Sequence, residues 1–306
     1  MKTVLLTTGG TIAGAASTAT DHVGYTAGAL GAADLVAAVP PLQGLPLEAQ
    51  RVAQLDSADM EHNTWQALAL AVQLHLARPD VGGIVITHGT DTLEETAFFL
   101  HSVLRADKPV VFTAAMRPAT ALSADGPQNL LDAVTVARTP GVAGVLVVVG
   151  GRVLAGHELR KVHGYRVDAF ETGDAGPLAL VEAGVLRVLR AWPVNAQPQA
   201  TLLHRPVADW PVVDIVTSHT SARGAVLAAC VAAGARGVVL AGTGNGTVHH
   251  SLLAAARQAQ AAGVVVWRSS RCLLGGVVGQ PEDALPSSGP LSPYQARVAL
   301  MLALAG

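Results

Sequence analysis

The chain has 306 residues, half of them hydrophobic, and only 14% carry a charge, against roughly 25% in an average soluble domain. Its formal net charge is −2 with no basic block, which argues against nucleic acid as a partner. The uncharged apolar stretches are shorter than the about 20 residues that cross a bilayer, so we expect no membrane span. The apolar surplus favours a sizeable core and contacts between subunits.

Short apolar segments alternate with helical patterns through the first half of the chain. Continuous Val- and Ile-rich runs, typical of parallel strands buried on both faces, occupy residues 3–8, 82–88, 108–115 and 144–150. Apolar residues recur at helical spacing over residues 60–78, 93–105 and 126–138. This alternation predicts an α/β fold, with a mostly parallel open sheet flanked by helices in a larger N-terminal domain.

The pattern changes twice further along. Residues 151–190 contain hairpin-like pieces, and residues 191–211 hold four prolines without a clear period. Strand and helix patterns then return, which predicts a smaller C-terminal α/β domain with a parallel sheet. We therefore expect an N-terminal catalytic domain over 1–190, a linker over 191–211 and a second domain over 212–306.

The two cysteines and the first residues of the chain allow predictions about metal binding and cellular location. Cys230 and Cys272 lie far apart, and we expect two buried free thiols rather than a disulfide. No Cys/His cluster has the spacing of a zinc site, so no metal is expected. The first apolar run leads directly into a predicted turn without a visible secretory signal, so we expect a cytoplasmic protein.

The segment TTGGTIAG, residues 7–14, ends the first predicted strand, where an open α/β sheet binds its ligands. Gly9 and Gly10 would let backbone N–H groups approach a ligand closely, although a tight turn would need the same residues. The fingerprints G-x-G-x-x-G and G-x-x-x-x-G-K-[ST] of nucleotide-binding loops are absent. Thr11 then places a hydroxyl next to a glycine hinge. From this motif alone, Thr11 is either a catalytic residue or part of a tight turn.

The segment THGTDT, residues 87–92, also ends a strand and leads into a helix. Thr92 as N-cap and Glu95 three residues later form a capping-box pattern. Capping does not account for Thr90 and Asp91, which precede the cap. A threonine beside an aspartate at a strand end can supply a hydroxyl and the group that orients it.

Several other polar residues have two interpretations each. Ser57 could cap a helix, or Ser57 and Asp59 could bind a zwitterion, the hydroxyl facing a carboxylate and the acid an ammonium. Lys161 is a surface lysine unless folding brings it to Thr90. Tyr25 is either a packed loop aromatic or a catalytic phenol. Asn245, in AGTGNG, also suits a turn with left-handed geometry.

Taken together, these motifs resemble a known family. The segments TGGTIAG and HGTDTLEETAFFL resemble the two signature motifs of the bacterial-type L-asparaginases, and the resemblance covers essentially the whole chain. It continues through KPVVFTAAMRPATALSADGPQNL, Lys161, AGTGNG, SSR and the closing LSPYQARVALMLAL. The resemblance implies an L-asparagine amidohydrolase that releases L-aspartate and ammonia and needs no metal or organic cofactor. It puts the nucleophile at Thr11, activated through Tyr25, beside a second cluster of Thr90, Asp91 and Lys161.

The resemblance also implies how substrate is held. Ser57 and Asp91 match positions that bind the α-carboxylate and α-amino groups of L-asparagine. The positions that match the pocket wall are Gly10, Gly89 and Ala115. Family members are homotetramers, dimers of dimers, in which a neighbouring subunit completes each site. The positions that match these contributions are Asn245 and Glu282.

The chemistry fits this assignment. A primary amide is a poor electrophile with a poor leaving group, so its hydrolysis needs an activated hydroxyl, oxyanion donors and an acid for ammonia. Burial would lower the pKa of Lys161, whereas a nearby Asp91 would raise it. We therefore interpret this lysine as part of a coupled proton network. The family usually has glutamine where this chain has Ala58. We therefore expect weaker substrate binding and weak or absent glutaminase activity.

Two alternatives stay open at this stage. One is a non-catalytic amino-acid sensor on the same fold, which retention of the hydroxyls argues against. The other is the glutamine-hydrolysing subunit of a tRNA-dependent amidotransferase, which carries an additional N-terminal domain and is disfavoured here by the absence of a basic surface.

Overall fold

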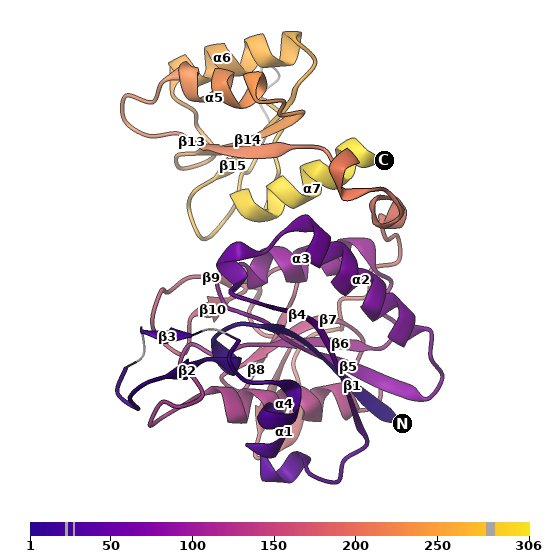
Figure 1. Cartoon of the computed structure of the whole chain (residues 1–306). Helices are drawn as coiled ribbons and strands as arrows, with labels where there is room; N and C mark the ends of the chain where they lie inside the picture. Colours follow the sequence, from indigo (N-terminus) through magenta and orange to yellow (C-terminus); the bar gives the residue numbers. More distant parts are fainter. Residues whose placement is uncertain (22–23, 27, 280–284) are drawn as a thin grey trace. The chain divides into compact units, whose positions relative to one another are not determined.

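A computed structural model describes residues 1–21, 24–26, 28–279 and 285–306 of the chain (Figure 1). These residues form two compact units, 1–198 and 199–306. The predicted linker is divided between them. Its first part, to Pro198, belongs to the first unit, and its later part forms two 3-10 turns, Ala200–His204 and Val207–Asp209, in the second unit.

The first unit contains an eight-stranded sheet with the order β12-β11-β8-β7-β6-β5-β1-β4. Its strands are β1 (Lys2–Gly9), β4 (Leu47–Leu55), β5 (Val81–Thr87), β6 (Pro109–Thr113), β7 (Gly144–Val149), β8 (Arg152–Ala155), β11 (Ala179–Glu182) and β12 (Val185–Val188). The five strands from β4 to β7 in this order run parallel, and β8, β11 and β12 continue the sheet antiparallel. Two small hairpins accompany the sheet, β2 (Ala15–Ala16) with β3 (Tyr25–Thr26) and β9 (Arg160–Lys161) with β10 (Phe170–Glu171).

Helices cover both faces of this sheet. As Figure 1 shows, α2 (His62–Leu76) and α3 (Leu93–Val103) lie on one face, and α1 (Ala32–Ala37) and α4 (Gly126–Arg138) on the other. The β5 and β6 side chains are buried almost throughout, because parallel strands with helices on both sides expose neither face. Trp65 of α2 stacks on Phe99 of α3, with ring centroids 4.9 Å apart, which fixes the two helices against each other.

The second unit is a three-stranded parallel sheet with the order β13-β14-β15. Its elements are β13 (Val213–Thr217), α5 (Gly224–Ala232), β14 (Gly237–Gly242), α6 (His250–Ala261), β15 (Val265–Ser270) and α7 (Pro293–Ala305). Helices α5 and α6 cover one face and α7 the other (Figure 1). Both cysteines are free as expected, but neither is buried: Cys272 is exposed and Cys230 partly so. Cys272 follows the exposed Arg271, and Cys230 packs against the core of the second unit but is only partly buried, so the predicted burial of both was wrong.

The predicted α/β class is confirmed, and the predicted strands and helices of both halves are present within a few residues. The sequence did not predict β4 or α1. β4 is the edge strand beside β1 and has no fully buried residue, so it lacks the continuous apolar run that identified the buried strands. Within the described residues, none of the helices has the length and apolar character that crossing a membrane requires.

Candidate active site

The candidate site begins where β1 and β5 end side by side. The two strands pair in parallel, with Thr7 opposite Thr87, so their carboxyl ends meet at one edge of the sheet. Gly10 has φ +83°, and a Cβ built on it would lie 2.4 Å from Gly89 Cα. The two glycine backbones are therefore in direct contact, which a side chain would prevent. This contact brings the residues that follow, Thr11 and Thr90, to the same edge.

Thr11 pairs with Tyr25 across a small hairpin. Thr11 starts a 3-10 turn and is 6% exposed, and its hydroxyl lies 2.6 Å from the Tyr25 hydroxyl. Tyr25 lies on β3 opposite Ala16 of β2, whose backbone N–H donates to Thr120 Oγ1 at 2.9 Å. At the other end of this loop, Gln54 Nε2 donates to the Gly28 carbonyl at 2.6 Å. The loop that carries Tyr25 is thus tied to the body of the unit at both ends.

A second cluster forms around Thr90. The Lys161 ammonium donates to Thr90 Oγ1 at 3.0 Å and contacts Asp91 Oδ1 at 2.5 Å, although these residues lie about 70 positions apart in the chain. The side chain of Lys161 is 18% exposed, whereas that of Asp91 is 54% exposed. Asp91 can therefore hold the lysine with one oxygen while its other oxygen faces a ligand.

Ser57 and Thr92 connect the neighbouring 3-10 turn to the start of α3. The Asp91 backbone N–H donates to Ser57 Oγ at 3.1 Å, and Thr92 Oγ1 donates to the Ser57 carbonyl at 2.8 Å. Thr92 is the N-cap of α3 as predicted, but its hydroxyl makes no capping bond and instead donates to the Ser57 carbonyl. Ser57 does not cap its turn either. Asp56 does so, accepting from the Ala58 N–H at 3.2 Å.

His88 stands beside the reactive groups but is part of the core. Its ring is fully buried, edge-on to Phe112, and Nδ1 donates to the Gly89 carbonyl at 2.7 Å. Burial lowers the pKa of His88 to about 4, and the bond to Gly89 opposes this only partly. His88 is therefore neutral near pH 7 and supports the turn that places Gly89 and Thr90.

The remaining predicted site residues are distributed as follows. Ala115 follows β6, is 1% exposed, and lies near Gly126, on which a Cβ would come within 3.4 Å of Ala115 Cβ. Asn245 belongs to the second unit, where its side-chain amide donates to the Val278 carbonyl and accepts the Val278 N–H, each at 2.7 Å. Glu282 lies outside the described residues.

Sequence reasoning missed the polar side chains that hold this site from behind. Thr120 and Gln54 tie the Tyr25 loop, and buried Glu94 accepts the backbone N–H of Lys161 at 2.7 Å. Each acts on a residue 26 to 104 positions away, so no local spacing could have identified it. An acidic residue in the first turn of a helix is also expected because it interacts favourably with the helix dipole. The position of Glu94 therefore did not point to a role in the site.

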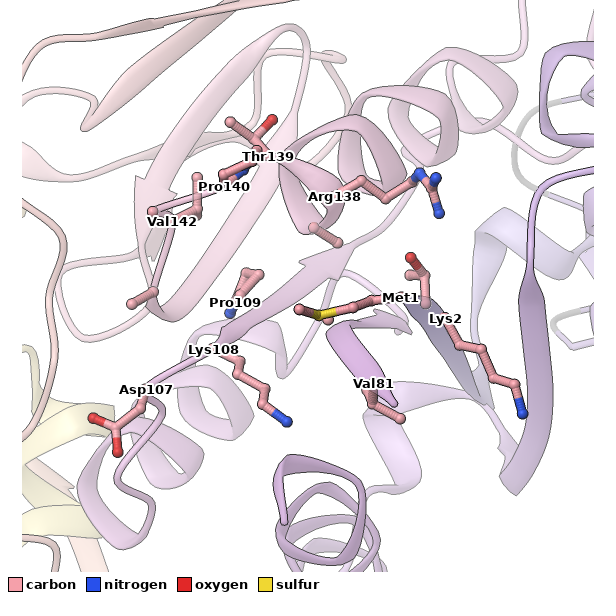
Figure 2. A pocket seen from close by; sticks show the side chains of 15 residues that line it. Met1, Lys2, Val81, Asp107, Lys108, Pro109, Arg138, Thr139, Pro140 and Val142 are labelled. Atoms are coloured by element: carbon pink, nitrogen blue, oxygen red, sulfur yellow. The ribbon is translucent and has the colours of Figure 1, made fainter. Parts of the chain in front are cut away.

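A hollow of about 520 Å³ lies at the amino-terminal ends of the parallel strands, opposite to the ends that carry the candidate site (Figure 2). Its lining includes Met1, Lys2 and Val81, at the amino ends of β1 and β5, and Arg138 at the end of α4. Ligands of open α/β sheets bind beyond the carboxyl ends of the strands, so this hollow is not the expected substrate site. Among the described residues, no three His, Cys, Asp or Glu side chains are grouped to hold a metal ion.

Comparisons with known proteins agree with the fold. The family model "Asparaginase, N-terminal" matches residues 2–193, and "Glutaminase/Asparaginase C-terminal domain" matches residues 212–306. The chain belongs to the asparaginase family.

Individual relatives include proteins named as asparaginases and proteins named as glutaminase-asparaginases. The chain is 40% identical to "L-asparaginase 2" of Escherichia coli K12, over 98% of this chain and 88% of that protein. It is 35% identical to "Glutaminase-asparaginase" of Pseudomonas fluorescens biotype A, over 98% and 85%. A crystal structure titled "Probable Cytoplasmic L-asparaginase" from Campylobacter jejuni matches with a TM-score of 0.91 at 36% identity, covering 99% of this chain and 94% of that one.

Proposed function

We propose that the chain hydrolyses L-asparagine to L-aspartate and ammonia with a threonine nucleophile. The observation that carries the proposal is the pair of hydroxyls at two touching strand ends, each with its own proton partner. Thr11 lies 2.6 Å from the Tyr25 phenol, and Thr90 accepts from the Lys161 ammonium at 3.0 Å. Amide hydrolysis needs a nucleophilic hydroxyl and a proton donor for the leaving nitrogen, and these two pairs supply both.

In this mechanism Thr11 Oγ1 attacks the side-chain amide carbon. Its proton passes to the Tyr25 hydroxyl, which releases its own proton to solvent, and solvent returns a proton to the Thr90–Lys161 pair after ammonia has left. The C–N bond then breaks, the nitrogen takes a proton from the Thr90–Lys161 pair, and ammonia leaves. Water hydrolyses the aspartyl ester on Thr11, which releases L-aspartate and restores the hydroxyl. Asp91 keeps the Lys161 side chain beside Thr90, because Asp91 Oδ1 and Lys161 Nζ are 2.5 Å apart.

The substrate is a small zwitterion, and the proposed pocket offers groups for both charges. The half-exposed Asp91 carboxylate binds the α-ammonium. Ser57 is 1% exposed and its oxygen already accepts the Asp91 N–H, so its hydroxyl hydrogen is its contribution to the α-carboxylate. Gly10, Gly89 and Ala115 form the wall, where their small size brings backbone close to the ligand.

We infer that glutamine is a poor substrate for this chain. Ala58 offers no side-chain amide to the α-amino end of the substrate, and a missing bond to a charged group costs about 1.5–3 kcal/mol. Glutamine is one methylene longer and needs more positioning. Relatives named for both activities exist, so the substrate ratio of this chain is a matter for measurement.

We further propose a homotetramer in which Asn245 and Glu282 of a neighbouring subunit complete each site. The support is the family resemblance and the apolar composition. Sedimentation equilibrium tests it, and a monomer with full activity would contradict it. Similar proteins include one named as a probable periplasmic and one named as a probable cytoplasmic L-asparaginase, so the cytoplasmic location stays a prediction.

The decisive experiment is ammonia release from L-asparagine and L-glutamine by the unaltered chain and by Thr11→Ala and Thr90→Val. Each substitution should lower kcat by about 10²–10⁴-fold, the usual contribution of such groups. Thr201→Val, at an exposed position of the second unit, is the matched control and should keep full activity. Asparagine that binds to the unaltered chain without ammonia release would favour the sensor instead.

A further inference from the structure

The strand that carries Lys161 is only two residues long. β9 pairs with β10, and just beyond it Val162 donates its N–H to the Ala169 carbonyl at 2.8 Å. Neighbouring N–H groups in a strand point to opposite edges, so the N–H of Lys161 points away from β10. It donates instead to Glu94 Oε2 at 2.7 Å. A carboxylate from α3 therefore takes the place that a further strand would occupy.

Glu94 belongs to one face of α3 that holds the whole segment 156–161. Glu94, Ala97 and His101 are spaced to share a helix face. Ala97 packs near Gly156, where a built Cβ would lie 3.4 Å from Ala97 Cβ. The His101 ring stacks on His157 with centroids 4.3 Å apart and planes 20° apart. The segment therefore lies along α3 in the opposite direction and is fixed at both ends.

We propose that Glu94 is a positioning residue, which places the Lys161 ammonium against Thr90 and Asp91 by holding the Lys161 backbone. The proposal rests on the amidohydrolase function proposed above. Thr90 and Asp91 immediately precede α3, and Glu94 is 7% exposed in its first turn. The start of α3 and the two residues before its N-cap therefore hold both the backbone and the ammonium group of Lys161. Because the lysine stem is long and flexible, the ammonium stays at Thr90 only while the Cα is fixed.

Steady-state kinetics with L-asparagine separate position from charge. Glu94→Ala removes the acceptor, and kcat should fall by about 10²-fold, the effect of a displacement near 1 Å, while KM changes little. Glu94→Gln keeps an acceptor oxygen without the charge and should restore most of kcat with the same pH profile. Glu95→Ala removes an acid from the same helix turn and serves as the matched control. A Glu94→Gln enzyme as impaired as Glu94→Ala, or an unimpaired Glu94→Ala enzyme, would overturn the proposal.

Lysine reactivity tests the same placement without any turnover. The chain has three lysines, so Lys2 and Lys108 are internal references for Lys161 in one sample. Trace acetylation followed by peptide mass spectrometry should show faster labelling of Lys161 in Glu94→Ala, and not in Glu94→Gln or Glu95→Ala. Unchanged labelling in all three variants would refute the positioning role. Absence of asparagine turnover in the unaltered chain would instead refute the proposed function and leave this result readable.

Discussion

Neighbouring residues in HGTDT have different roles, and the contacts of each side chain determine which. His88 is buried and neutral, and it holds the Gly89 carbonyl. Thr90 meets Lys161, whereas Thr92 bonds the Ser57 carbonyl. The sequence predicted the N-cap position of Thr92 because that depends on local spacing. It could not predict the partner of the Thr92 hydroxyl, which comes from a turn 35 residues earlier.

Substitution of Ala58 tests the argument on substrate preference. Ala58 is exposed on the turn that carries Ser57, so a longer side chain has room there. Ala58→Gln should lower KM for L-asparagine by about 10- to 100-fold and raise the relative turnover of L-glutamine, since a bond to a charged group is worth about 1.5–3 kcal/mol. Ala58→Leu is the control for added volume. Equal glutamine and asparagine turnover by the unaltered chain would contradict the argument.

At the scale of elements, the contact between the ends of β1 and β5 builds the candidate site. Both strands were predicted from their apolar runs, and the alternation of strands and helices in the chain predicts that they run parallel. The neighbours of β1 in the sheet were not predicted, because β4, which the sequence did not predict, lies between β1 and β5 in the chain, and both β4 and β5 flank β1 in the sheet. Gly10 and Gly89 come into contact only because β1 and β5 are neighbours in the sheet.

Gly10→Ala tests this contact, and Gly141→Ala is a closely matched control. The two glycines have nearly the same φ, +83° and +82°, but a Cβ meets Gly89 at 2.4 Å in the first case and nothing within 4 Å in the second. Gly141→Ala should lower the free energy of unfolding by about 1–2 kcal/mol through backbone strain alone. Gly10→Ala should cost a further 1–3 kcal/mol or so and reduce kcat sharply. Equal losses in chemical denaturation would show that the close approach is unimportant.

At the scale of the whole molecule, buried histidines make stability depend on pH. The pKa values of His88 and His101 are each lowered to about 4. Burial is the main cause for both, and His157 adds repulsion at His101 that Glu158 partly opposes. In the unfolded chain both would titrate near 6.5. Full stability is therefore present above pH 6.5 and is lost as the pH falls from there toward 4.

The expected loss is about 3 kcal/mol for each histidine, at about 1.4 kcal/mol per pKa unit. Urea unfolding at a series of pH values measures it. His101→Phe keeps a ring to stack on His157 without titrating at this position and should reduce the slope between pH 6.5 and 4. His204→Gln, at an exposed position, is the control and should leave the slope unchanged. The same slope in His101→Phe as in the unaltered chain would contradict the assignment.

The sequence by itself determined the α/β class, most strands and helices, and the glycine–threonine motifs at two strand ends, because these are written in local periodicity and turn chemistry. The family resemblance implied that Lys161 lies near Thr90. Only the tertiary structure determined the contact that joins them, the tie from Ser57 and Thr92 to α3, and the bond by which Glu94 holds the Lys161 backbone. These contacts join residues 35 to 71 positions apart. Such pairs depend on strand order and helix packing, which no local pattern specifies.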